Sequence, residues 1–112
     1  MCPADVSVSV QLTARSWSVI DATMDNTATN ALHGFDEATE TVARDIRQAG
    51  WDQVPWVDGQ WPPMDQVLTI RLLAVQWEFA VSHLAKSLAW PSDDESEALE
   101  RAALAEVSPQ LG

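Results

Sequence analysis

The side chains that most often perform catalysis or bind metals are few in this sequence, and they lie far apart. His33 and His83 are the only histidines, and neither has a second ligand at the spacing of three or four residues that zinc sites use. Asp21 and Asp25 are one helical turn apart, and such a pair can hold a metal or share a proton. No His or Glu completes that pair at a matching spacing, so we expect a solvated helix face there.

Nucleophilic and phosphate-binding motifs are also missing from the sequence. Cys2 is the only cysteine, which excludes an intrachain disulfide, and it lies too close to the terminus for a catalytic nucleophile. The four glycines are isolated at turns and form no phosphate-binding loop. We therefore predict that the protein is not an enzyme, and that it has no catalytic residue, cofactor or metal.

Tryptophan is the residue type that most favours a binding function. Three of the six tryptophans lie in the connector 51–66, together with three prolines. Within it, Asp58-Gly59 is a strong signal for a two-residue hairpin turn, which would place Trp56 opposite Trp61. These rings could fold back as a lid on the core, or they could remain accessible as a partner surface. The candidate interaction surface consists of Trp51, Trp56, Trp61, Met64 and Trp90.

Two similar segments must position these residues. VQLTARSWSVIDATM begins at Val10 and IRLLAVQWEFAVSHL begins at Ile70, and their tryptophans, Trp17 and Trp77, are sixty positions apart. Each segment starts with alternating apolar and polar residues, typical of a strand with one buried face, and continues with the periodicity of an amphipathic helix. Thr13 is a good N-cap for the first helix, whereas its counterpart Leu73 is not.

A second helix is expected after each of these strand–helix pairs. Asp36 can cap a helix over 37–49, for which Gly50 is a natural C′ residue. Ser92 and Glu95 have the spacing of a capping box, which predicts a last helix that ends near Val107. The apolar stripe of that helix is thin, so it should pack loosely or against a partner; it comprises Leu99, Ala102, Ala103 and Val107.

The order of elements predicts an α+β fold with two similar strand–helix–helix units. A two-stranded sheet, antiparallel about a local two-fold axis in the simplest arrangement, would be covered by about four helices. A right-handed crossover with parallel strands is the alternative. We expect a single domain over 1–112, with a first unit at about 6–50, the connector at 51–66 and a second unit at about 67–107.

This order, with the VSVQLTARSW junction between strand and helix, resembles the ribbon-helix-helix fold. In that fold two chains each contribute a strand and two helices, whereas here both copies would lie on one chain. The resemblance implies that the outward strand residues Ser9, Gln11, Thr69 and Arg71 occupy the positions that contact bases in ribbon-helix-helix repressors. One Arg on a chain of net charge −11 cannot neutralise phosphates, so the resemblance concerns architecture only.

The charge narrows the range of partners. Seventeen acidic and six basic residues disfavour contact with nucleic acid and with anionic membranes. The N-terminus lacks the pattern of a signal peptide, and no apolar run is long enough to span a membrane, so we expect a cytoplasmic protein. We predict a non-catalytic protein–protein interaction module, with a homodimer as one possible form. The alternatives are an acidic inhibitor or immunity-type protein that binds a basic partner, and a small-ligand binder that uses the connector.

Overall fold

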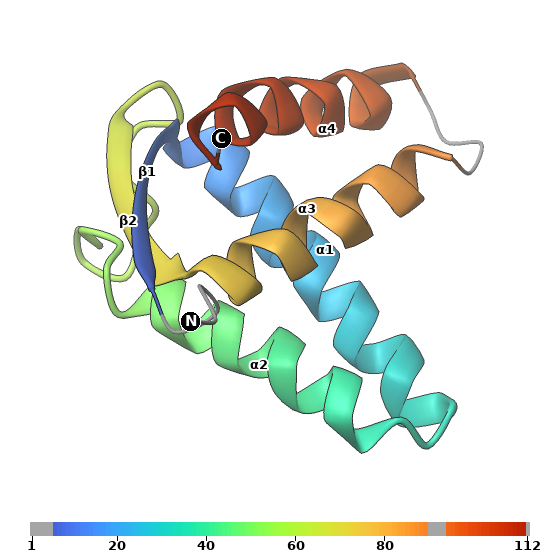
Figure 1. Ribbon diagram of the computed structural model, residues 1–112. Coiled ribbons are helices and arrows are strands. Elements are labelled where there is room, and N and C mark those ends of the chain that lie inside the picture. Colours follow the sequence, from blue (N-terminus) through green and yellow to red (C-terminus); the bar gives the residue numbers. More distant parts are fainter. Residues whose placement is uncertain (1–5, 90–93, 112) are drawn as a thin grey trace.

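The computed structural model describes residues 6–89 and 94–111, and it confirms the α+β fold with an antiparallel sheet of two strands and four helices. The four helices lie together on one face of the sheet (Figure 1), and the other face is open. No helix in these residues is long and apolar enough to cross a membrane. The elements are β1 (Ser7–Thr13), α1 (Ala14–His33), α2 (Glu37–Trp51), β2 (Val67–Leu73), α3 (Ala74–Leu88), α4 (Asp94–Val107) and a final 3₁₀ turn, η2 (Ser108–Leu111).

The two strands pair so that Val10 lies opposite Ile70. Their burial alternates as the period-two pattern predicted, because successive side chains of a strand point to opposite faces. The buried face is apolar and the outward face is mostly polar. The buried side chains are Val10, Leu12, Leu68, Ile70 and Leu72, and the outward ones include Ser9, Gln11, Thr69 and Arg71.

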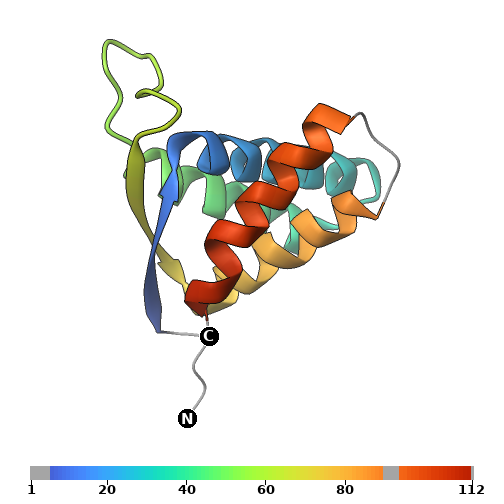
Figure 2. The same ribbon diagram turned by 90° about the horizontal axis from the view of Figure 1, so that it is seen from above.

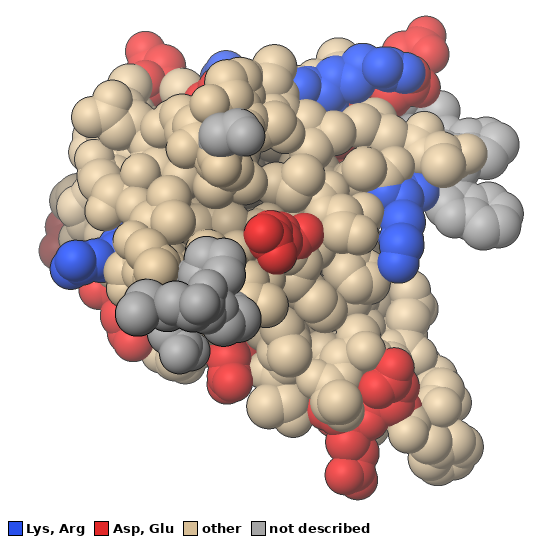
Figure 3. All heavy atoms as spheres, in the orientation of Figure 1, with Lys and Arg blue, Asp and Glu red and all other residues tan. Residues whose placement is uncertain are grey.

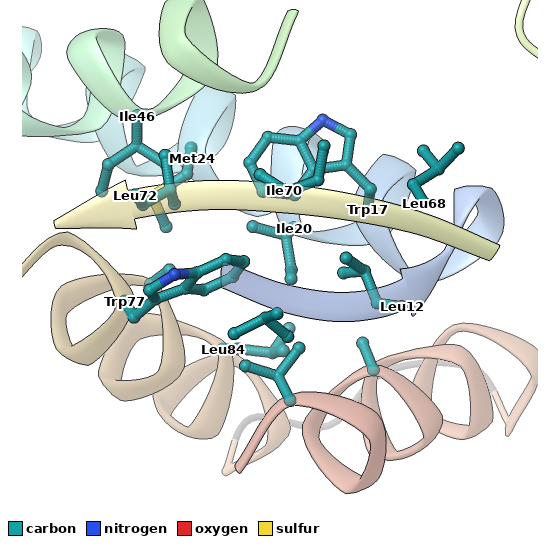
Figure 4. Packing of buried hydrophobic residues seen from close by; sticks show 14 of the residues in the cluster. Leu12, Trp17, Ile20, Met24, Ile46, Leu68, Ile70, Leu72, Trp77 and Leu84 are labelled. Carbon is teal, nitrogen blue, oxygen red and sulfur yellow. The ribbon is translucent and has the colours of Figure 1, made fainter. Parts of the chain in front are cut away.

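Trp17 and Trp77 meet at the centre of the core, between the sheet and the helices (Figure 4). Their rings pack edge to face, with centroids 6.2 Å apart and planes at 80°. Both side chains are completely buried, but within the described part of the chain only the Trp77 indole N–H has an acceptor, the carbonyl of Val8 at 2.9 Å. The Trp17 Nε1 atom is buried without a hydrogen-bond partner in those residues. The two core tryptophans therefore differ in whether the indole N–H is hydrogen-bonded.

Gly50 has a different role from the one that the sequence suggested. It lies inside α2, which ends at Trp51, so the prediction of a C′ glycine was wrong. A Cβ atom at this position would lie 1.7 Å from Cζ2 of Trp17. Glycine is therefore needed because the Trp17 ring packs directly on the backbone of α2.

The helix starts combine local and distant contacts. Thr13 caps α1 as predicted, accepting from the Ser16 amide at 3.2 Å. Glu106 of α4 adds its carboxylate, which accepts from the Thr13 amide at 2.8 Å and from the Ser16 hydroxyl. At α3, where Leu73 cannot cap, the Gln76 side chain accepts from the Leu73 amide at 2.9 Å. In both helices a side chain thus accepts from the amide of the residue that precedes the first turn.

The second helix of each pair also starts and ends close to its predicted bounds. Asp36 caps α2 as predicted, accepting from the Thr39 amide at 3.1 Å. The predicted cap Ser92 lies outside the described residues, and α4 ends at Val107 as expected. Ala103 and Val107 are fully buried in the common core, whereas Ala102 is exposed and was wrongly placed on the apolar stripe.

Each outer edge of the sheet is occupied by a glutamine side chain. Gln53 accepts from the Arg71 amide and donates to the Arg71 carbonyl, both at 2.7 Å. At the opposite edge, Gln110 accepts from the Gln11 amide at 2.8 Å and donates to its carbonyl at 2.6 Å. Because these amides use the backbone groups that an added strand would use, the edges are not open for strand addition at these positions.

Candidate interaction surface

The connector forms the hairpin turn that its sequence predicted. Val57 and Gln60 exchange two backbone hydrogen bonds, at 3.1 and 2.9 Å. Asp58 and Gly59 both adopt positive φ, 51° and 76°, which is the backbone of a type I′ turn. Figure 2 shows the connector as a loop that projects beyond the helices, next to the start of β2.

Three tryptophan rings contact one another in series beside this turn, tilted and not stacked. Trp56 and Trp61 face each other as predicted, with ring centroids 4.6 Å apart, and Trp51 lies 5.5 Å from Trp56 at an interplanar angle of 61°. We call these three residues the tryptophan cluster. Trp56 and Trp61 are partly buried against the core, while Trp51 is 45% exposed. The cluster is therefore neither a closed lid nor a fully exposed patch.

Hydrogen bonds hold the cluster in place. The Trp51 indole N–H donates to Oδ1 of Asp21 at 2.8 Å, and the Trp56 indole N–H donates to the carbonyl of Trp51 at 3.0 Å. The end of the connector is also attached, because the Ala14 amide donates to the Gln66 carbonyl at 2.9 Å. Rings fixed in this way lose little conformational freedom when a partner binds.

The environment of Asp21 differs from the solvated helix face that the sequence predicted. It is only 8% exposed, not part of a solvated helix face. Arg47 of α2 donates to Asp21 at 3.0 Å and to Asp25 at 3.2 Å, and its guanidinium lies 5.7 Å from the ring centroid of Trp51. The two carboxylates therefore position an arginine and a tryptophan. Sequence spacing could not reveal this, because Asp21 and Arg47 are 26 residues apart.

A surface hollow of about 420 Å³ lies against the cluster, lined by Trp51, Trp56, Gly59, Gln60 and Trp61. Val57, next to it on the hairpin, is 60% exposed. Of the five residues predicted for the interaction surface, the structure brings Trp51, Trp56 and Trp61 together. Met64 is partly buried and does not line the hollow, and Trp90 lies outside the described residues.

The surface carries two further features, an exposed phenylalanine and a polar hollow. Phe35, at the turn between α1 and α2, is 92% exposed and has a φ of 60°, which is unusual for an aromatic residue. A polar hollow of about 290 Å³ between α1 and α3 includes His83, whose pKa is lowered by burial and by the nearby charge of Lys86. Within residues 6–89 and 94–111, no three His, Cys, Asp or Glu side chains are grouped to hold a metal.

Comparisons with models of known families, with curated proteins and with solved structures found no match to this chain. Its function must therefore be inferred from its own side chains, of which the tryptophan cluster is the most specific group.

Proposed function

We propose that the protein is a non-catalytic protein–protein interaction module whose contact surface is the tryptophan cluster. One observation carries the proposal: three contacting tryptophans border an open hollow outside the main core, and two of them are held by hydrogen bonds to Asp21 and to the backbone. Tryptophan is among the residues that contribute most to binding at protein interfaces. An apolar surface that the chain leaves partly uncovered is typical of such a site.

A capture experiment with matched variants tests the proposal. The full chain, a Trp61→Ala variant and a Phe35→Ala variant are immobilised and exposed to cell extract. Phe35 is the control because it is an exposed aromatic residue outside the cluster. We expect proteins that bind the parent and Phe35→Ala but not Trp61→Ala, and a purified partner should then lose about tenfold or more in affinity. If no protein depends on Trp61, the proposal is wrong.

Self-association through the same surface is one form of this function. Light scattering over a range of concentrations gives the native mass, and a dimer that Trp61→Ala dissociates would identify a second copy as the partner. The sheet edges offer little support for a dimer, because Gln53 and Gln110 already bond them.

An acidic inhibitor that binds a basic partner is the second candidate, and the net charge of −11 favours it. On the face shown in Figure 3, however, the Asp and Glu side chains are scattered and do not form one patch. A dispersed charge speeds the approach of a basic partner but does not define its position. Capture that disappears at moderate salt and is unaffected by Trp61→Ala would favour this candidate.

The architecture also supports a proposal about its origin: two related strand–helix–helix units form the chain. Val10 and Ile70, which pair in the sheet, are sixty positions apart, as are Trp17 and Trp77 in the core. Gln11 and Arg71, whose backbones Gln110 and Gln53 bind, have the same separation. These matching separations support the proposed relationship between the two units, which would be related by a local two-fold axis close to the Val10–Ile70 pair. Nearly neutral effects of both Trp17→Ala and Trp77→Ala would contradict the proposal.

A further inference from the structure

We propose that the tryptophan cluster binds an extended, proline-rich peptide segment that carries Lys or Arg. This inference rests on the proposed interaction function and names the chemistry of the partner. It depends on the juxtaposition of three features: tilted aromatic rings in series, one indole N–H that the chain leaves without an acceptor, and acidic side chains without basic ones in the connector.

The hydrogen bonds of the three indoles differ in a way that points to a ligand. Trp51 and Trp56 donate within the chain, to Asp21 and to the Trp51 carbonyl. The Trp61 indole N–H has no acceptor among residues 6–89 and 94–111, although its ring lines the hollow. Two rings are therefore fixed, and the third offers a donor to an incoming carbonyl oxygen.

A polyproline II peptide supplies suitable carbonyl groups. Its backbone makes no internal hydrogen bonds, so its carbonyls remain available to an indole N–H. Its conformation is already ordered before binding, and grooves lined by aromatic side chains are a recurring site for such segments. A helix or a paired strand has already used most of its carbonyls.

The arrangement of the rings favours proline rings over flat ligands. Trp51 and Trp56 are tilted by 61°, and Trp56 and Trp61 by 56°, so the rings form ridges and not one flat platform. Neighbouring ring centroids are 5.5 and 4.6 Å apart. Each step corresponds to between about one and two residues of a polyproline II chain, which rises about 3.1 Å per residue. Prolines on one face of that chain recur every third residue, about 9 Å apart. One proline ring can therefore pack between two tilted tryptophans while the next contacts the far end of the cluster.

The charge of the connector selects a basic peptide. Residues 51–66 include Asp52, Asp58 and Asp65 but no Lys or Arg. Arg47 and Arg44, which line a hollow beside Trp51, are both paired with carboxylates, Arg47 with Asp21 and Asp25 and Arg44 with Glu40. An acidic segment would be repelled, whereas Lys or Arg beside the prolines would be attracted and could also lie over an indole face. A second copy of this chain, also at −11, is disfavoured for the same reason.

Titration of the full chain with synthetic peptides tests the inference, with binding followed by calorimetry and tryptophan fluorescence. The probe peptide has prolines at every third position and two flanking arginines. Its controls replace the prolines by alanine or the arginines by glutamate. We expect saturable binding to the probe, and about tenfold weaker binding or none to either control.

Three variants locate the binding site. Trp61→Ala should weaken binding about tenfold, and Trp61→Phe, which keeps a ring but removes the N–H donor, should weaken it severalfold. Asp58→Asn preserves the turn, because Asn-Gly also favours type I′, and should weaken binding of the arginine-bearing probe while reducing its salt dependence. Phe35→Ala should leave the affinity unchanged. Circular dichroism and thermal melts establish that each variant is folded, and Asp58→Asn remains informative if Trp61→Ala unfolds.

The outcomes separate this inference from the proposed function. If no proline-rich peptide binds while capture from extract still depends on Trp61, the inference is wrong and the interaction function stands. If neither occurs, both are wrong. Equal binding of the probe to the parent and to folded Trp61→Ala or Trp61→Phe would also overturn the inference, as would tighter binding of the glutamate-bearing control.

Discussion

Five tryptophans of the described chain fall into two groups that are held in opposite ways. Trp17 and Trp77 are completely buried and are fixed by close packing between the sheet and the helices. The tryptophan cluster lies outside that centre and is fixed mainly by hydrogen bonds, to Asp21 and to the backbone. Burial of the first pair stabilises the fold, whereas directional bonds in the second group hold rings in place without hiding them. One residue type thus stabilises the core in one region and, in the function that we propose, binds a partner in another.

Truncation should separate the two groups most clearly. Trp17→Ala and Trp77→Ala should each lower the free energy of unfolding by about 3–5 kcal/mol, because each leaves a large cavity in a close-packed core. Trp61→Ala should cost only about 1 kcal/mol, since it removes a partly exposed cross-strand contact. Urea unfolding of the three variants measures these values. A loss at Trp61 as large as that at Trp77 would show that the connector belongs to the main core.

The contact between Gly50 and Trp17 should be the next most sensitive feature. Gly50→Ala should destabilise the protein by about 1–3 kcal/mol, because the added methyl group overlaps a ring that cannot move away. The higher helix propensity of alanine, about 1 kcal/mol, offsets only part of this loss. In a Trp17→Phe background, where the overlapping Cζ2 atom is absent, most of the cost should disappear. An unchanged cost there would mean that the overlap with Trp17 is not its source.

Replacement by phenylalanine tests the difference in hydrogen bonding between the two core tryptophans, Trp17 and Trp77. Trp77→Phe removes the hydrogen bond to the Val8 carbonyl, whereas Trp17→Phe removes an N–H that has no partner among residues 6–89 and 94–111. We expect Trp77→Phe to cost about 1 kcal/mol more than Trp17→Phe. Thermal or urea unfolding of both proteins gives the difference, and equal losses would contradict this account of the two indoles.

The attachment of the connector to the sheet should make a smaller contribution. Gln53→Ala removes both bonds to the Arg71 backbone and should cost about 1 kcal/mol or less, because water can reach this exposed edge. Hydrogen exchange at the Arg71 amide should become faster, while exchange at Gln11, held by Gln110, should not change. Gln110→Ala is the matched control and should show the reverse pattern.

The smallest expected effect is a dependence of stability on pH through His83. Its pKa in the folded protein is lowered from 6.5 by burial and by the Lys86 charge, so the unfolded chain binds the proton more readily. The free energy of unfolding should therefore fall as the pH decreases through about 6.5, and this contribution should level off below the folded pKa. His83→Gln should flatten the profile between pH 5 and pH 7 (approximate limits of this titration). An unchanged profile would exclude His83 as the source.

Local signals in the sequence were sufficient for the elements and for part of the site. Period-two and helical patterns identified both strands and all four helices, because burial of one face imposes that periodicity on the residues themselves. Thr13, Asp36 and the Asp58-Gly59 turn were recognised because a cap or a tight turn depends on neighbours within a few positions. The same turn predicted that Trp56 and Trp61 face each other.

Contacts between distant residues were decided only by the tertiary structure. Asp21 is buried because Arg47 and Trp51, far along the chain, supply the donors that its carboxylate needs. Gly50 is required by a ring on another helix, and Glu106 completes the cap at Thr13, 93 residues earlier in the chain. Periodicity shows which face of an element is buried, but not which side chain of another element meets it. The sequence by itself thus determined the strands, the helices and the hairpin, whereas packing decided which polar groups are paired and which tryptophans remain exposed.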